Sequence, residues 1–170
     1  RHHPGALRDA RLGETSPPSA SGTLHDRLAL MGGEAIVASL HHLAEDQAAA
    51  IVQDESLVTY AHKLAKAEGQ IDWSQSAAQI DRQIRGLQPW PVAFCQHAEQ
   101  TLRVWSAQLT DGTSDQPAGT ITAVGKHGVN VVCGDGLLIR LTSLQWAGGK
   151  PLNSVQMFQA NKIQLGDILS

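Results

Sequence analysis

Cysteine is scarce in this 170-residue sequence, the charge is low, and no long apolar run occurs. The two cysteines, Cys95 and Cys133, cannot form a disulfide framework and are not spaced as the ligands of a zinc site. No stretch reaches the ~18 consecutive apolar residues of a membrane span, and the chain does not open with the pattern of a secretory signal. We therefore expect a chain of the reducing cytoplasm, with no membrane segment and no metal site.

Charged residues are few and unevenly distributed. They make up 17% of the sequence, against roughly 25% in an average soluble domain. The formal net charge is -3, and residues 1–59 carry 4 Lys/Arg against 8 Asp/Glu, whereas residues 60–170 carry 9 against 8. A protein that coats nucleic acid indiscriminately would be far more basic. Any nucleic-acid partner must therefore be recognised by a local basic patch.

The N-terminal region predicts one helix after a segment that is a poor fold-former. Prolines and a Ser/Gly-rich run interrupt every hydrophobic period in residues 1–22, which we expect to be disordered. Thr23 then begins a predicted helix, with Asp26 in a capping-box position, and apolar spacings of three and four continue to about Leu43. Gly32-Gly33 within it predicts a close packing contact. Because a lone amphipathic helix needs a surface to pack against, we expect the chain to begin inside a larger protein.

A second helix is predicted to begin at Ser76, with Gln79 in a capping-box position, and to end at Gly86 and Pro89. One face of this helix is apolar and consists of Ala77, Ile80, Ile84 and Leu87. The opposite face is expected to point outward and holds Asp81, Arg82 and Arg85.

Beyond residue 91 the hydrophobic period changes from 3.6 to 2, which predicts strands. The alternation occurs near residues 92–94 and over 101–109, 119–125, 129–133 and 137–144. The connections Lys126-His127-Gly128 and Gly134-Asp135-Gly136 have the composition of hairpin turns. Five short strands with tight turns indicate a small barrel or sandwich. A short helix near 154–160 and a final extended piece are expected to follow.

No self-sufficient active site can be assembled from the residues. Cys95 and His97 would share one face of a strand, but without an orienting group core packing of Cys95 is the better interpretation. Asp135 lies between two glycines and is better explained by a turn than by a cation site. Nucleotide-binding loops and the H-E-x-x-H metal motif are absent. We therefore expect no catalytic, cofactor-binding or metal-ligating residue in this chain.

Binding is better supported than catalysis. Nine basic side chains are spread over residues 60–170, and two predicted turns present lysines at their tips. Trp90, Trp105 and Trp146 lie near predicted strand ends, where they would either stack on bases or fill the core. If the basic residues gather on one barrel, they would form a groove that follows a nucleic-acid backbone.

Several separated motifs resemble one family. The runs TYAHKLAK (59–66), IDWS (71–74), RQIRGL (82–87) and PWP (89–91) are similar to the linker and the start of the C-terminal domain of methionyl-tRNA formyltransferases. PAGTI (117–121), GDG (134–136) and LQWAGGK (144–150) continue the resemblance in the family's order. The helix near residues 22–43 also resembles the last helix of that family's N-terminal domain. The resemblance covers residues 23–170.

The resemblance implies a fold and a division of the chain. The implied fold class is α+β, mainly β: a small OB-like β-barrel of about five to six strands, preceded by two helices and a linker. Residues 1–22 would be a segment foreign to the family, and residues 23–58 a remnant helix of the catalytic domain with the start of the linker. Residues 59–75 would be the linker, and residues 76–170 the tRNA-binding domain.

The resemblance also implies an activity for the whole protein. This family transfers a formyl group from the co-substrate 10-formyltetrahydrofolate to methionyl initiator tRNA, in translation initiation. Its catalytic and folate-pocket residues belong to an N-terminal domain to which no position here corresponds. We therefore expect an inactive, monomeric part that lacks the catalytic domain and binds the tRNA. The side chains expected to contact tRNA are basic: Lys63, Lys66, Arg82, Arg85, Lys126, Lys150 and Lys162.

Three alternatives remain open at the level of sequence. The chain could be the C-terminal domain of another folate-dependent formyltransferase, for example one that acts on a nucleotide-linked sugar. It could be a stand-alone OB-type module that binds single-stranded RNA, or a gene remnant without function. The tRNA-type linker and the Pro89-Trp90-Pro91 motif favour the methionyl-tRNA enzyme over the first alternative.

Overall fold

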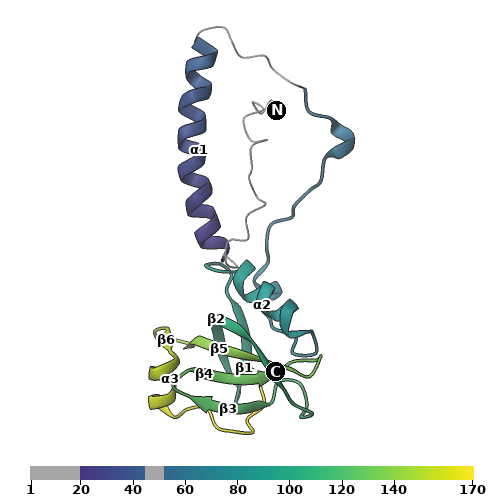
Figure 1. Cartoon of the computed structure of the whole chain (residues 1–170), viewed down its shortest axis with the longest axis vertical. Coiled ribbons are helices and arrows are strands. Elements are labelled where there is room, and N and C mark those ends of the chain that lie inside the picture. The colour runs from purple at the N-terminus through teal and green to yellow at the C-terminus, as the bar shows by residue number, and fades with distance from the viewer. Residues whose placement is uncertain (1–19, 45–51) are drawn as a thin grey trace. The chain divides into compact units, whose positions relative to one another are not determined.

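A computed structural model describes residues 20–44 and 52–170, and the chain divides between Lys63 and Leu64 into two compact units (Figure 1). The region predicted to be disordered, 1–22, lies almost entirely outside the described residues.

The first unit contains the long helix α1 (Ser21–Ala44) and the short 3₁₀ helix η2 (Glu55–Leu57). The helix was predicted, but its start was wrong: the hydroxyl of Thr23 donates to the carbonyl of Ala20 at 2.7 Å, so Thr23 lies inside the first turn. An added Cβ at Gly32 or Gly33 would meet nothing within 4 Å among the described residues, so the expected close packing contact is not made by them. No residue of α1 is buried. Its exposed apolar side chains include Leu24, Leu28, Met31 and Ile36.

The second unit begins with the 3₁₀ helix η3 (Lys66–Gly69) and the helix α2 (Ala77–Gly86). The prediction for α2 is confirmed: Ser76 is its N-cap and accepts a hydrogen bond from the backbone of Gln79 at 3.3 Å. The four predicted apolar positions are all buried. The expectation for the outward face was wrong at Asp81, which is only 7% exposed. Arg85 Nε donates to Asp81 Oδ2 at 2.9 Å, and this pairing offsets the energetic cost of burying the carboxylate charge.

The rest of the second unit is a six-stranded antiparallel sheet with the order β1-β2-β5-β4-β3, and β6 pairs with β5. This confirms an α+β fold with a small barrel-like domain of about five to six strands. The strands are β1 (Ala93–His97), β2 (Gln100–Thr113), β3 (Ile121–Gly125), β4 (Gly128–Val132), β5 (Leu137–Trp146) and β6 (Leu152–Asn153). The predicted short helix is α3 (Ser154–Ala160), which Asn153 caps.

The sheet does not close on itself, because its edge strands β1 and β3 are not paired with each other. The C-terminal segment 166–170 bonds to both edges instead. Gly166 N donates to Ile121 O, at the start of β3, at 2.9 Å, and Ser170 N donates to Gln96 O of β1 at 3.1 Å. The final extended piece expected from the sequence therefore bridges the gap between the two edge strands.

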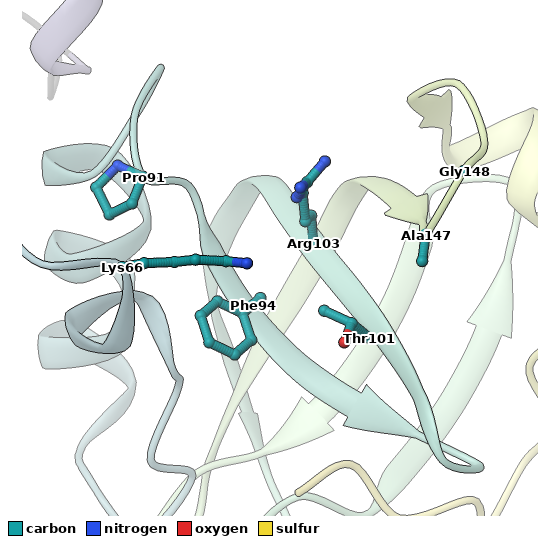
Figure 2. Close-up of a pocket in the computed structure, with 7 residues that line it drawn as sticks. All are labelled: Lys66, Pro91, Phe94, Thr101, Arg103, Ala147 and Gly148. Atoms are coloured by element: carbon teal, nitrogen blue, oxygen red, sulfur yellow. The ribbon is translucent and has the colours of Figure 1, made fainter.

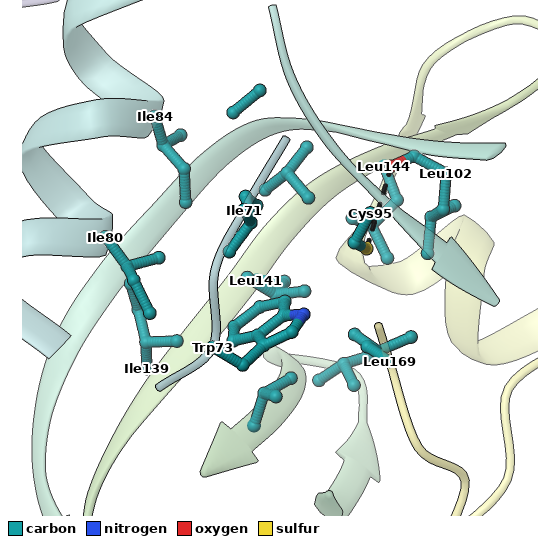
Figure 3. Close-up of a cluster of buried hydrophobic side chains, with 14 of the residues drawn as sticks. Ile71, Trp73, Ile80, Ile84, Cys95, Leu102, Ile139, Leu141, Leu144 and Leu169 are labelled. Atoms are coloured by element: carbon teal, nitrogen blue, oxygen red, sulfur yellow. Dashed lines mark hydrogen bonds between the residues drawn. The ribbon is translucent and has the colours of Figure 1, made fainter. Parts of the chain in front are cut away.

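The core of the second unit includes two residues that precede α2, as Figure 3 shows. Ile71 and Trp73 are 2% and 5% exposed, and Ile71 N donates to the carbonyl of Phe94 at 2.8 Å. Residues 64–75, which the sequence analysis assigned to the linker, therefore pack with the barrel. The boundary lies at 63/64 rather than at 75/76, because these two large apolar side chains are buried among the strands.

The turn between β4 and β5 also packs against the segment before α2. Gly134 N donates to the carbonyl of Gln75 at 2.9 Å, and Asp135 Oδ2 accepts from the backbone N–H of Ala77 at 3.1 Å. Asp135 thus satisfies a donor of the first turn of α2, where a carboxylate is stabilised by the helix dipole. The interpretation of Asp135 as a turn residue is confirmed, and the capping contact adds to it.

Candidate functional site

A groove of about 300 Å³ lies on the second unit, beside the face of the sheet formed by β1 and β2 (Figure 2). Its lining residues come from four places in the sequence: η3, the loop before β1, the strands β1 and β2, and the loop after β5. They are Lys66, Pro91, Phe94, Thr101, Arg103, Ala147 and Gly148.

Strand alternation explains the floor of the groove. Phe94 is paired with Arg103 across the β1–β2 ladder, and its neighbours Ala93 and Cys95 are completely buried. Because successive side chains of a strand point to opposite faces, Phe94 and Arg103 lie on the outer face. The same argument places Thr101 beside them, two residues before Arg103.

The segment η3 is held against this face by two contacts. Gln83 of α2 donates from Nε2 to the carbonyls of Glu68 and Gln70, at 3.0 and 2.9 Å. Gly69 is buried, and a Cβ there would lie 2.7 Å from Val92 O and 3.1 Å from two ring carbons of Phe94. Only glycine fits this approach without displacing a neighbour. As a result, Lys66 extends across Phe94 toward β2 (Figure 2).

The opposite wall of the groove is the loop 147–149, which a glutamine holds in place. Gln145 Oε1 accepts from Trp105 Nε1 at 2.8 Å, and Gln145 Nε2 donates to the carbonyl of Gly149 at 2.7 Å. The backbone N–H of Ala147 also donates to the carbonyl of Thr101 at 3.2 Å. Both ends of the loop are therefore tied to the sheet.

The groove carries two uncompensated positive charges. Among the described residues, neither Lys66 nor Arg103 forms an ion pair, and both are exposed. The nearby acidic residue, Glu68, accepts a hydrogen bond from the backbone of Ala65 at 2.6 Å and so caps η3. Two cations beside an apolar ring and a hydroxyl are suited to an anion attached to a planar group.

Of the seven basic residues expected to contact tRNA, Lys66 alone lines the groove. Lys150 directly follows the loop 147–149, which forms one wall of the groove. Two others already have partners in the fold: Arg85 bonds to Asp81, and Lys162 Nζ lies 5.3 Å from the centre of the Trp146 ring, a cation–π contact. The remaining three residues are exposed: Arg82 and Lys126 of the second unit do not line the groove, and Lys63 belongs to the first unit. Lys126 lies in the turn that joins β3 to β4.

Arg103 is the residue of this site that sequence reasoning did not select. Alternation in the run 101–109 already indicates that Arg103 points outward. Its position beside Phe94 depends on the register between β1 and β2, which cannot be derived from the local sequence pattern.

The tryptophans occupy different environments. Trp146 is 8% exposed and belongs to the core, which is one of the two positions expected for it from the sequence. Trp105 is half-buried and bonded to Gln145, whereas Trp90, next to Pro91, is 56% exposed. Exposure therefore leaves Trp90 as the tryptophan whose ring is most available for stacking.

The thiols are not nucleophiles in this fold. Cys95 Sγ lies 3.7 Å from the carbonyl of Leu102, and burial raises the pKa of Cys95 and of Cys133 to about 12. His97 shares the buried face of β1 with Cys95, but its Nε2 is 2.8 Å from Asp167 Oδ2. The interpretation of Cys95 as a core residue is confirmed. Across residues 20–44 and 52–170, no three His, Cys, Asp or Glu side chains gather as a metal site requires.

No helix in the described ranges has both the length and the apolar character needed to cross a membrane.

Comparison with known sequences gives consistent matches. The family model of the formyl transferase C-terminal domain matches residues 63–162. The methionyl-tRNA formyltransferase of Acinetobacter baumannii (strain ACICU) is 50% identical over 158 residues, which cover 88% of this chain and 48% of that protein. The methionyl-tRNA formyltransferase of Hahella chejuensis (strain KCTC 2396) is 47% identical over 149 residues, covering 86% and 46%. The chain thus spans about half the length of these relatives.

Solved structures show a related fold. HypX from Aquifex aeolicus in complex with tetrahydrofolic acid aligns with a TM-score of 0.59 at 15% identity, over 81% of this chain and 26% of that one. A variant of the same protein aligns with a TM-score of 0.64 at 14% identity, over 84% and 27%. At this identity the likeness concerns the fold alone. The family match and the close relatives together establish that the chain belongs to the formyl transferase C-terminal domain family.

Proposed function

We propose that this chain is the tRNA-binding, C-terminal part of a methionyl-tRNA formyltransferase. In this proposal the whole enzyme transfers a formyl group from 10-formyltetrahydrofolate to methionyl initiator tRNA, in translation initiation in the cytoplasm. A catalytic domain that precedes the present residues in the whole enzyme supplies the chemistry and holds the folate. The present chain is monomeric, inactive alone, and binds the tRNA.

One observation carries the proposal: Lys66 and Arg103 share a groove and lack acidic partners among the described residues. Unpaired cations on a surface of low overall charge suit a polyanion that is bound at defined positions. The similarity to named methionyl-tRNA formyltransferases supports tRNA as that polyanion.

The other expected contacts extend this surface. We propose that Lys63 and Lys66 contact the backbone near the acceptor arm of the tRNA. The body of the tRNA would be held by the remaining basic residues: Arg82, Arg85, Lys126, Lys150 and Lys162. Such contacts position the tRNA and do not read its sequence.

Binding of charged initiator tRNA at several salt concentrations tests the proposal. Each phosphate contact that is lost should lower the slope of log K against log salt by roughly 0.9, so Lys63→Ala with Lys66→Ala should lower it by roughly 0.9 if one contact is lost and by roughly 1.8 if both are lost. Arg27→Ala is the matched control, because Arg27 is an exposed cation of α1 outside the proposed set. Failure of the wild-type chain to bind the tRNA, or equal slopes in the double variant and the wild type, would contradict the proposal.

Two further measurements separate the alternatives. The isolated chain, supplied with 10-formyltetrahydrofolate and charged initiator tRNA, should produce no formylmethionyl-tRNA; product formation would overturn the assignment of catalysis to another domain. Binding to an unstructured RNA oligomer as tightly as to initiator tRNA would instead favour a single-strand-binding module.

A further inference from the structure

We infer that the groove holds one unpaired nucleotide of the bound RNA, with its phosphate between Lys66 and Arg103 and its base against Phe94. This inference rests on the proposed function, because it names the part of the tRNA that this groove accepts. It assigns a role to Phe94, Thr101 and Arg103, none of which was among the expected contacts.

The groove has the size and lining of a site for a small ligand. Its volume of about 300 Å³ lies at the lower end of the range for ligand pockets, roughly 300–1,000 Å³. A protein that only follows the outside of an RNA helix needs cations, but it does not need an apolar floor, since paired bases stay stacked inside the duplex. The aromatic ring of Phe94 in this groove therefore indicates a base that has left its stack.

The groups around the phosphate position are donors. Figure 2 shows the amine end of Lys66 directed across Phe94 toward the strand that carries Thr101 and Arg103. The Thr101 hydroxyl accepts from Gln96 Nε2 at 3.3 Å, which leaves its own hydrogen free to donate. An ammonium, a guanidinium and a hydroxyl thus line the same groove, and these are the donor types that bind the oxygens of a phosphodiester.

The Phe94 ring is fixed in place. Its ring carbons Cδ1 and Cε1 each lie 3.1 Å from the position that a Cβ of Gly69 would occupy, so η3 packs closely against the ring. Phe94 is half-buried, and the part of the ring that is not covered lines the groove. A held aromatic ring is a stacking platform that accepts any base, which fits a site without hydrogen-bond readout.

Gln145 acts as a positioning residue for this site. Its two hydrogen bonds, to Trp105 at 2.8 Å and to Gly149 at 2.7 Å, hold the loop that forms the far wall. Gln145 does not line the groove itself.

The first test compares two substitutions of Phe94 on two ligands. Phe94→Leu keeps an apolar side chain but removes the π face, so initiator tRNA should bind about tenfold more weakly, while a blunt, fully paired RNA duplex should bind as before. Phe94→Tyr keeps the ring and should bind the tRNA within about twofold of the wild type. Urea unfolding of each variant checks that it is folded. An equal loss on both ligands, or no loss with Phe94→Leu, overturns the inference.

The second test asks whether Lys66 and Arg103 share one phosphate. If both cations neutralise the same phosphate, the cation that remains in each single variant still neutralises it. Lys66→Ala and Arg103→Ala should therefore each lower the salt slope by clearly less than about 0.7, and the double variant should lower it by about 0.7. Additive losses, of about 0.7 in each single variant and about 1.4 in the double variant, would show two phosphates and overturn the clamp. Wild-type chain that fails to bind tRNA at all would refute the proposed function. Wild-type binding with additive slopes or an inert Phe94→Leu would refute only this inference.

A third measurement needs no substitution. In an NMR titration of the wild-type chain with adenosine 5′-monophosphate, the backbone amides of Phe94, Thr101 and Arg103 should shift, while that of Lys126 in the distant hairpin turn should not. Shifts that are absent, or spread equally over Lys126 and the groove, would contradict a nucleotide site here.

Discussion

His97 Nε2 lies 2.8 Å from Asp167 Oδ2, and this hydrogen bond joins the end of β1 to the C-terminal segment. The backbone carbonyl of Asp167 accepts from Ile121 N of β3 at 2.9 Å. Asp167 thus contacts one edge strand through its side chain and the other through its backbone. Because β1 and β3 do not pair with each other, Asp167 is a bridge across the open side of the sheet.

The stability of this bridge should depend on pH. A hydrogen bond from the Gln164 backbone and the contact with His97 hold the pKa of Asp167 below its ordinary value of 3.8. A lowered carboxyl pKa stabilises the fold at pH values above the unfolded pKa, and this contribution is lost as the pH falls through the folded pKa. Asp167→Asn should therefore lower the free energy of unfolding by about 1 kcal/mol at pH 6. The difference from the wild type should be smaller at pH 3, below the ordinary pKa of 3.8, and should shrink further as the pH falls through the folded pKa.

Urea unfolding at pH 6, 5 and 3 measures this difference. Asp115→Asn is the control, because Asp115 is an exposed carboxylate in the loop after β2. A difference between Asp167→Asn and the wild type that grows as the pH falls would have the wrong sign and would contradict the stabilising role of the carboxylate.

Gly134 is expected to be intolerant of any side chain. A Cβ at this position would overlap the carbonyl oxygen of Ser74, which is backbone and cannot move aside cheaply. Gly134→Ala should therefore lower the free energy of unfolding by about 2 kcal/mol or more, measured by urea unfolding. Gly86→Ala is the matched control, since an added Cβ there meets nothing within 4 Å, and alanine favours the helix. Equal free energies of unfolding for the two variants would show that the turn at Gly134 can move away from Ser74 without a loss of stability.

Local sequence signals were sufficient for most elements of the barrel. Ser76 capped the helix it was expected to cap, and the hairpin turns at 126–128 and 134–136 joined strands near the predicted bounds. These features depend on residues within a few positions of one another, so they can be predicted from a single sequence.

Features that depend on distant residues were not found in the sequence. Ile71 and Trp73 looked like parts of a linker, because nothing near them shows that strands from further along the chain cover them. Asp81 looked exposed on helical periodicity, although its burial follows from packing of α2 and from the pair with Arg85. The groove required Lys66, Arg103 and the loop after β5 to meet, and that meeting depends on strand register and on the position of η3.

Neighbouring arginines of α2 should differ in what they do. Arg85 Nε donates at 2.9 Å to Asp81, whose side chain is only 10% exposed, whereas Arg82 is exposed on the helix surface. Arg85→Gln leaves a buried carboxylate without this partner and should lower the free energy of unfolding by about 2 kcal/mol. Arg82→Gln should change that free energy by less than about 0.5 kcal/mol, yet lower the salt slope of tRNA binding by roughly 0.9. Urea unfolding and tRNA titration on the same two variants measure both effects. If Arg85→Gln leaves the free energy of unfolding as unchanged as Arg82→Gln does, then the pair between Arg85 and Asp81 does not stabilise the fold.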